Sequence, residues 1–175
     1  MRPSYKTRYR QMKRTLILVR HTKSDWGDFS QPDFDRHIKK DRIDDAKNMA
    51  AKLKELGIKP DLIICSPAKR TRQTVEYFCD KLKYNYDKIQ FDKRIYESTA
   101  EDVLQVIRET EADVKTLMVV GHNPSLTHLA NMFTANSIDE IPTTGVVWLE
   151  FAVKSWEIYK LTPCKLKAFL TPKAI

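Results

Sequence analysis

The sequence predicts an α/β domain built on a mostly parallel sheet, and three similar stretches carry this prediction. Residues 16–19, 61–65 and 116–120 are short, largely apolar runs, each followed at once by polar residues. Runs of this length are typical of strands that are buried on both faces. Segments with helical spacing separate the runs, and strands that alternate with helices indicate parallel pairing.

The first half of the chain is expected to hold one long loop and two helices. Residues 22–40 are polar and aromatic without a clear period, and long loops of this kind are often functional. A helix is predicted over 41–56, with Asp41 as its N-cap. A second helix follows Ser66, the expected N-cap, with Pro67 at its first position. The buried stripe of this second helix is predicted to be Val75, Phe78, Cys79 and Leu82.

The second half of the chain continues the alternation of strands and helices and then ends in two consecutive strands. A short strand is expected near 89–91, and the Ser-Thr-Ala-Glu stretch at 98–101 has the pattern of a capping box that opens a third helix. Residues 123–124, Asn-Pro, are expected to cap a fourth helix. Residues 145–151 and 156–161 are predicted to be two strands joined by a short turn, which adds an antiparallel edge to the sheet.

Length and charge are those of a single domain with a basic tail. The 175 residues include 31 Lys and Arg and 23 Asp and Glu, for a net charge of +8. Six of the basic residues and no acid lie in residues 1–14, which we interpret as a tail and a candidate for disorder. Residues 15–175 form the predicted domain. Because the charge outside the tail nearly balances, it gives only weak support to nucleic-acid binding.

Nothing in the sequence predicts secretion or membrane insertion. The apolar run at 16–19 is too short for a signal peptide, and no stretch approaches the length of a membrane span. The chain has three cysteines, Cys65, Cys79 and Cys164. Because this number is odd and no CxxC pair occurs, packed free thiols are expected. We therefore expect a protein of the reducing cytoplasm. The alternative is an organelle protein, because an acid-free, Arg-containing N-terminus is also typical of a transit peptide.

Cationic and hydrogen-bonding side chains follow the three buried strands. Arg20 and His21 follow the first, Arg70 lies just after the second and His122 follows the third. In open α/β sheets ligands bind outside the carboxyl ends of the strands, so these residues are expected to form an anion pocket. A neutral imidazole at His21 can attack phosphorus while the cations stabilise the phosphoryl oxygens. Neighbouring positive charge is expected to keep His21 unprotonated at neutral pH.

Other phosphate chemistries fit the sequence less well. The chain has neither a GxxxxGK[ST] loop nor a GxGxxG turn. The Asp-Phe-Asp stretch at 33–35 resembles the paired aspartates of a magnesium-dependent phosphatase, but no apolar strand precedes it; polar loop residues are the simpler interpretation. The four histidines lack metal-binding spacing, so no metal site is predicted.

The motifs at the strand ends resemble those of a known family. Arg20-His21-Thr22 resembles the RHG or RHA signature of the histidine phosphatase superfamily. Ser66-Pro67 with Arg70, and the Gly-His-Asn-Pro stretch at 121–124, resemble its second and third motifs. The short length and the closing segments at 141–145 and 161–163 are most similar to the SixA-type phosphohistidine phosphatases. The resemblance covers nearly everything after residue 14.

The resemblance implies a three-layer α/β/α sandwich with a phosphoglycerate mutase-like central sheet. It implies that His21 is the phosphorylated nucleophile, that Arg20, Arg70 and His122 bind the phosphoryl group, and that neither metal nor cofactor takes part. The chain departs from the family pattern at three positions. Thr22 replaces a small Gly or Ala, and His37 and Asp41 stand where the SixA-like pattern has Pro and Gly.

The general acid is the least defined member of the predicted site. Glu97 lies just before a predicted helix and is the candidate, in analogy to the carboxylate that protonates the leaving group in larger relatives. A polar loop residue is the alternative. Residues 23–26 lie close enough to the motif to touch substrate, or form only surface loop. Imidazole is a better leaving group than an alkoxide, so a weak acid would favour phosphohistidine over sugar phosphates.

The function expected from the sequence is that of a metal-independent phosphatase that works through a phosphohistidine intermediate. Its expected substrate is phosphohistidine in a signalling protein, as in SixA. A small-molecule phosphomonoesterase that uses the same site is the first alternative. A non-catalytic module that binds phosphate or nucleic acid through the basic tail and the anion pocket is the second.

Overall fold

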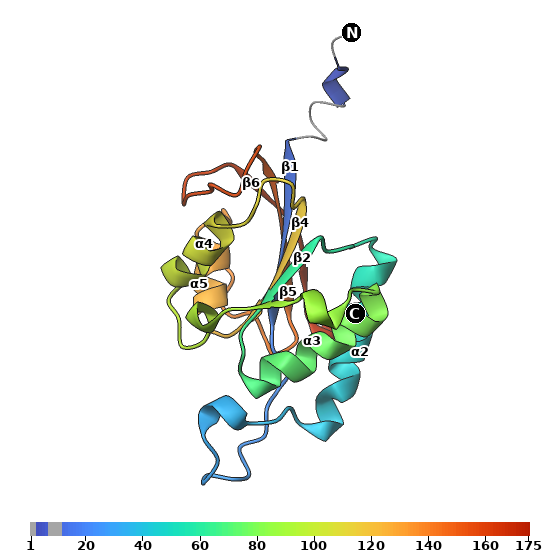
Figure 1. Cartoon of the computed structure of the whole chain (residues 1–175), viewed down its shortest axis with the longest axis vertical. Coiled ribbons are helices and arrows are strands. Elements are labelled where there is room, and N and C mark those ends of the chain that lie inside the picture. The colour runs from blue at the N-terminus through green and yellow to red at the C-terminus, as the bar shows by residue number, and fades with distance from the viewer. Residues whose placement is uncertain (1–2, 7–11) are drawn as a thin grey trace.

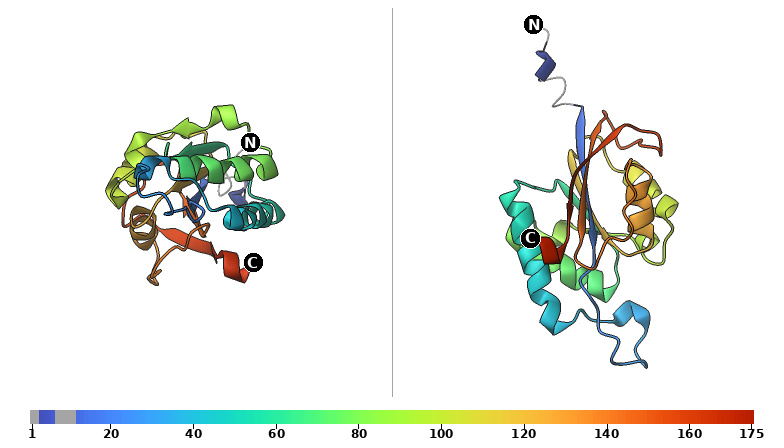
Figure 2. Two further views of the ribbon diagram at one scale, coloured as in Figure 1. Left: turned by 90° about the horizontal axis from the view of Figure 1, so that it is seen from below. Right: turned by 180° about the vertical axis from the view of Figure 1, so that it is seen from behind.

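The structure is a computed structural model that describes residues 3–6 and 12–175. One six-stranded sheet runs through the molecule in the order β3-β2-β4-β1-β5-β6. Figure 1 shows helices α2 and α3 on one face of this sheet and helices α4 and α5 on the other, and Figure 2 shows the same three layers from below and behind. The predicted three-layer α/β/α sandwich is therefore confirmed.

The described elements alternate along the chain much as the sequence predicts. The strands are β1 (Lys13–Arg20), β2 (Leu62–Cys65), β3 (Gln90–Phe91), β4 (Thr116–Gly121), β5 (Val146–Ala152) and β6 (Cys164–Leu170). The helices are α2 (Ile43–Glu55), α3 (Lys69–Leu82), α4 (Ala100–Arg108) and α5 (Ser125–Asn131), with 3-10 turns η1 (Asp33–Asp35), η2 (Lys40–Arg42), η3 (Tyr86–Lys88), η4 (Lys93–Ile95) and η5 (Pro172–Ala174). No described helix is long and apolar enough to cross a membrane.

Strand β1 lies at the centre because both of its faces are apolar. Leu16 and Leu18 pack toward α4 and α5, whereas Ile17 and Val19 pack into the separate cluster under α2 and α3. It pairs in parallel with β4 and antiparallel with β5. Successive side chains of a strand point to opposite faces, so an unbroken apolar run supplies both layers of the core.

Strand β1 also includes two residues that were expected to belong to the basic tail, Lys13 and Arg14. Lys13 pairs with Ala152 of β5, and Arg14 is almost fully buried. The Arg14 guanidinium donates to the carbonyl oxygen of Ala112 at 2.6 Å and to that of Lys154. Residues 1–2 and 7–11 of the predicted tail lie outside the described residues.

Three predicted helix starts were wrong, and for Ser66 and Ser98 the reason is that the expected capping hydroxyl has another partner. Asp41 belongs to η2, and α2 begins after Arg42 without a side-chain cap. The hydroxyl of Ser66 lies against a histidine, and α3 begins at Lys69 after Ala68. The capping box of α4 is formed by Thr99 and Asp102, one residue later than predicted, because Ser98 donates to the carbonyl of Ile95 instead.

The predicted strand at 156–161 was also wrong. Trp156 is buried and its indole N–H donates to the carbonyl oxygen of Val114 at 2.8 Å, which ties this segment to the loop before β4. The antiparallel partner of β5 is β6, whose residue Cys164 lies opposite Phe151. The buried Trp156 and Ile158 therefore belong to the long connection between β5 and β6, not to a strand.

Candidate active site

The two histidines of the predicted site are brought together by the pairing of β1 with β4. Arg20 lies opposite Gly121 in the parallel register, so His21 and His122 leave the sheet side by side. Their ring centroids are 5.2 Å apart, and both residues are buried. Both line a cavity of about 500 Å³, together with Arg20, Arg36, Arg70 and Asn123.

A hydrogen bond to the backbone fixes the tautomer of His21. Its Nδ1 lies 2.8 Å from the carbonyl oxygen of Thr22, which can only accept, so Nδ1 carries the proton and Nε2 keeps its lone pair. Burial lowers the pKa of His21 to about 3; the bond to Thr22 opposes this shift, and the charge of Arg70 reinforces it. His21 is therefore a neutral imidazole at neutral pH, with burial contributing more than the neighbouring charges.

The backbone around His21 is held from two sides. The amide of Thr22 donates to Thr74 Oγ1 of α3 at 2.9 Å. The amide of Thr144, in the turn before β5, donates to the carbonyl oxygens of Arg20 and His21 at 3.1 and 3.0 Å. Thr144 also donates its hydroxyl to Thr22 Oγ1 at 3.0 Å, so the larger Thr22 is accommodated by a specific partner.

Arg20 and Arg70 are each held by hydrogen bonds from one part of the guanidinium group, while the Nε of each has no acceptor among the residues that the structure describes. Arg20 donates to Glu140 at 2.9 Å and to the carbonyl oxygen of Ile141 at 2.8 Å. Arg70, near the start of α3, donates to the carbonyl oxygen of Asp33 at 2.8 Å. Within the described residues the buried Nε atoms of Arg20 and Arg70 have no acceptor. Buried donors without acceptors are costly, so the site is suited to an oxyanion.

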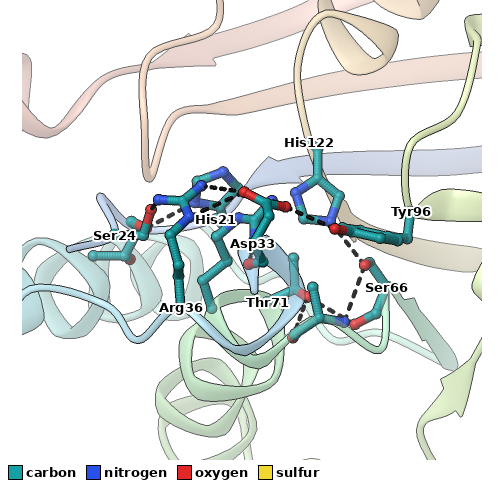
Figure 3. Close-up of polar contacts among 11 residues, drawn as sticks. His21, Ser24, Asp33, Arg36, Ser66, Thr71, Tyr96 and His122 are labelled. Atoms are coloured by element: carbon teal, nitrogen blue, oxygen red, sulfur yellow. Dashed lines mark hydrogen bonds and ion pairs between the residues drawn. The ribbon is translucent and has the colours of Figure 1, made fainter. Parts of the chain in front are cut away.

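A third arginine, Arg36 on the loop before α2, also lines this cavity and was not among the predicted site residues. Its Nε and Nη2 donate to Asp33 Oδ1 at 3.0 and 2.7 Å, and it also contacts the hydroxyl of Ser24. Its guanidinium stacks on the ring of Trp26, 3.4 Å from the centroid. Figure 3 shows Arg36 beside His21. The sequence signal that could have identified Arg36 is its position directly before His37, since the SixA-like pattern with Pro at the position of His37 has Arg before that Pro.

Asp33 lies between Arg36 and Arg70 and contacts both guanidinium groups. Its Oδ2 lies 3.1 Å from Arg70 Nη2 and accepts from the Tyr96 hydroxyl at 2.7 Å (Figure 3). Burial raises the pKa of Asp33, but hydrogen bonds from Tyr96 and Arg36 and the charge of Arg70 lower it to about 2. Its oxygens are thus occupied by two guanidinium groups and a phenol, which does not fit the paired-aspartate magnesium site considered from the sequence.

His122 is oriented by Ser66, at the end of β2. Ser66 Oγ lies 2.7 Å from His122 Nε2 and accepts the amide proton of Ala68 at 3.3 Å. The Ser66 hydroxyl can therefore donate to Nε2, which leaves the proton of the neutral ring on Nδ1. Burial and the charge of His21 lower the pKa of His122 to about 2. His122 then offers a neutral N–H donor.

Glu97 is not part of this cluster. It is exposed, adopts a left-handed backbone conformation with φ 51°, and does not line the cavity that holds the histidines. Its neighbour Tyr96 contacts His122 edge-on, with the ring centroids 5.6 Å apart. In the described part of the chain no group of three or more His, Cys, Asp or Glu side chains could hold a metal ion.

Comparisons with known proteins agree with this geometry. The sequence profile of the histidine phosphatase superfamily (branch 1) matches residues 16–112, more than half of the chain. An uncharacterised chloroplast protein of Arabidopsis thaliana is 32% identical over 154 residues, which cover 83% of this chain and 70% of the relative.

Two solved structures share the fold over almost the whole chain. The crystal structure of a SixA protein from Agrobacterium tumefaciens has a TM-score of 0.78 at 25% identity and covers 91% of this chain and 98% of its own. The structure of the protein histidine phosphatase SixA complexed with tungstate has a TM-score of 0.75 at 17% identity, covering 91% and 97%. The chain belongs to the histidine phosphatase superfamily, and its structure is of the SixA type.

Proposed function

We propose that this protein is a metal-independent phosphatase that transfers the phosphoryl group of a protein phosphohistidine to Nε2 of His21. The observation that carries the proposal is the state of His21: a buried, neutral imidazole whose Nδ1 proton is held by the Thr22 carbonyl. The unprotonated Nε2 is a nucleophile, and Arg20, Arg36 and Arg70 line the same cavity.

The reaction would proceed in two displacements at phosphorus. Nε2 of His21 attacks, the bond from phosphorus to the substrate imidazole breaks, and the leaving imidazole keeps the electron pair and takes up a proton. Phosphorylated His21 carries positive charge on its ring, which the Nδ1–H bond to the Thr22 carbonyl stabilises. Water then attacks phosphorus, the bond from phosphorus to Nε2 breaks, and inorganic phosphate leaves. One proton of the water returns to solvent, and His21 regains its neutral form.

The surroundings of the site favour a phosphoramidate over a phosphate ester. An alkoxide leaving group needs a positioned acid, whereas imidazole leaves with less help. Glu97 lies outside the cluster, and the carboxylate of Asp33, with a pKa near 2, is ionised at working pH. These positions support the phosphohistidine class and make Glu97 a weaker candidate for the general acid.

The expected partner is a phosphohistidine-bearing domain of a signalling protein, and the expected location is the cytoplasm. Trp26 and Phe29 are exposed on the loop that borders the cavity, where a protein surface could contact them. The buried thiols of Cys65 and Cys79 are free, which suits a reducing compartment.

Phosphate release tests the proposal directly. The substrates are a phosphohistidine-bearing protein domain, p-nitrophenyl phosphate and 3-phosphoglycerate, each measured with and without EDTA. We expect fast release from the phosphohistidine protein that is insensitive to EDTA, abolished in His21→Ala and retained in His128→Ala, a control on the exposed face of α5. Turnover that survives in His21→Ala contradicts the nucleophile, and faster turnover of a small ester contradicts the substrate class.

The non-catalytic alternative is tested with a truncated chain. Because β1 begins at Lys13 and Arg14 is buried, the truncation must stop at residue 11. Nucleic-acid affinity that disappears in this truncation, in a protein that releases phosphate from none of the three substrates, would favour the binding module.

A further inference from the structure

A second cavity adjoins the one that holds the histidines. Its volume is also about 500 Å³, and it shares Lys23, Pro142 and Thr143 with the first cavity. Beyond these shared residues it is bordered by Arg42 and Lys173. The two cavities thus form one trough that begins at His21 and continues past Lys23.

Three segments of the chain deliver cations to this second cavity. Lys23 follows β1, Arg42 precedes α2 and Lys173 lies in η5, which packs against α2 at the carboxyl end of the chain (Figures 1 and 2). The backbone of Lys23 is held in place, since its carbonyl oxygen accepts the amide of Lys39 at 2.8 Å. The convergence is a product of the fold, because these residues are far apart in sequence.

The positive charge of this cavity is largely uncompensated. Among residues 3–6 and 12–175, no carboxylate lies within 4.0 Å of the ammonium of Lys23 or of Lys173. Asp45 is the one acid in the lining, and it lies 3.9 Å from Arg42, at the limit of an ion pair. Clefts lined by charge of one sign attract ligands of the opposite sign.

We propose that this second cavity is a subsite for a further anionic group of the substrate, bound while the phosphoryl group lies at His21. The inference rests on the proposed phosphatase function and adds the substrate class: a phosphoryl compound with a second negative charge. That charge is a carboxylate beside the phosphohistidine in a protein, or a second phosphate in a small molecule. Lys23 would contact both ends of the substrate.

Equilibrium binding tests the subsite without relying on turnover. One pair of ligands is a peptide with a non-hydrolysable phosphonate analogue of phosphohistidine, flanked by Glu or by Gln. The other pair is the bisphosphate and the monophosphate of propane-1,3-diol. Calorimetry gives the ratio of Kd values in each pair for the wild type, for Arg42→Gln/Lys173→Gln and for Lys59→Gln/Lys81→Gln. This last variant removes the same charge at a cavity beside the start of β2, at the other end of the sheet.

We expect the ligand with the extra charge to bind about fivefold to tenfold more tightly to the wild type, in at least one pair. The ratio should fall toward one in Arg42→Gln/Lys173→Gln, where Lys23 is the remaining cation of the cavity, and persist in the control variant. Preference in the peptide pair identifies a protein source, and preference in the diol pair a small molecule. A ratio near one for both pairs in the wild type, or an equal loss in both variants, overturns the subsite. Failure of the phosphatase itself would appear separately, as absent phosphate release.

Discussion

The rings of His21 and His122 lie with centroids 5.2 Å apart, each one residue beyond a matched position in two parallel strands. Arg20 of β1 is the register partner of Gly121 of β4, so one strand pairing places both histidines. Gly121 permits this arrangement, because a Cβ there would lie 3.0 Å from the side chain of Ile95. Sheet register thus places the proposed nucleophile, His21, beside the ring of His122.

The two buried histidines should make the protein acid-sensitive. Below the ordinary histidine pKa of 6.5 the unfolded chain binds protons, whereas folded His21 and His122, with pKa values near 3 and 2, do not. The free energy of unfolding should therefore fall as the pH drops from 6.5 to 4.5, by up to about 2.7 kcal/mol per pH unit for the pair. Urea unfolding across this range measures the slope. His128→Gln should keep the slope, and an NMR titration of either buried ring with a midpoint near 6.5 would contradict the prediction.

Replacing Ser66 should change the tautomer of His122. In Ser66→Ala the ring loses its partner at Nε2, so the proton is no longer directed to Nδ1. We expect phosphate release, measured as kcat/KM, to fall about tenfold. This is less than the ~10²-fold to 10³-fold typical of removing a donor itself, because Ser66 acts through the ring of His122. Nitrogen chemical shifts of the imidazole report the tautomer. Ser125→Ala is the control, since that hydroxyl bonds the backbone of His122; an unchanged tautomer in Ser66→Ala would refute the assignment.

Thr74 should support the motif through its hydroxyl. Thr74→Val keeps the shape of the side chain but leaves the buried amide of Thr22 without an acceptor, which should lower the free energy of unfolding by about 1–3 kcal/mol. Because Thr22 also holds Nδ1 of His21, kcat should fall too. Thr74→Ser retains the acceptor and serves as the control in denaturation and in phosphate release. Equal effects of Val and Ser would assign the role to packing.

Asp33 should position Arg36 and Arg70 for the phosphoryl group. Asp33→Asn keeps the size of the side chain but removes the charge that both guanidinium groups contact. We expect kcat/KM for the phosphohistidine protein to fall by about tenfold, with the larger part of the change in kcat. Tyr96→Phe, which removes one hydrogen bond to the same carboxylate, should have a smaller effect. A rise in kcat/KM in Asp33→Asn would mean that the carboxylate competes with the substrate.

Much of the fold could be predicted from sequence because its signals are local. Apolar runs gave the positions of β1, β2 and β4, and helical spacing gave the buried faces of the helices between them. The first residues of the helices were harder to predict. Serine is a common capping residue, but in the folded chain the hydroxyl of Ser66 bonds His122 and that of Ser98 bonds the carbonyl of Ile95. Whether such a hydroxyl caps its helix or bonds another group depends on which elements pack beside it, and the local sequence does not specify that packing.

By itself, the sequence determined the order of the strands and helices and the residue types at the strand ends. Arg20, His21, Arg70 and His122 were therefore identifiable before the structure. Only the tertiary structure brought Asp33 to Arg70, 37 residues away, and to Tyr96, 63 residues away, and left Glu97 outside the cluster. The physical reason is that periodicity reports whether a residue is buried, whereas its hydrogen-bond and ion-pair partners depend on how distant elements dock.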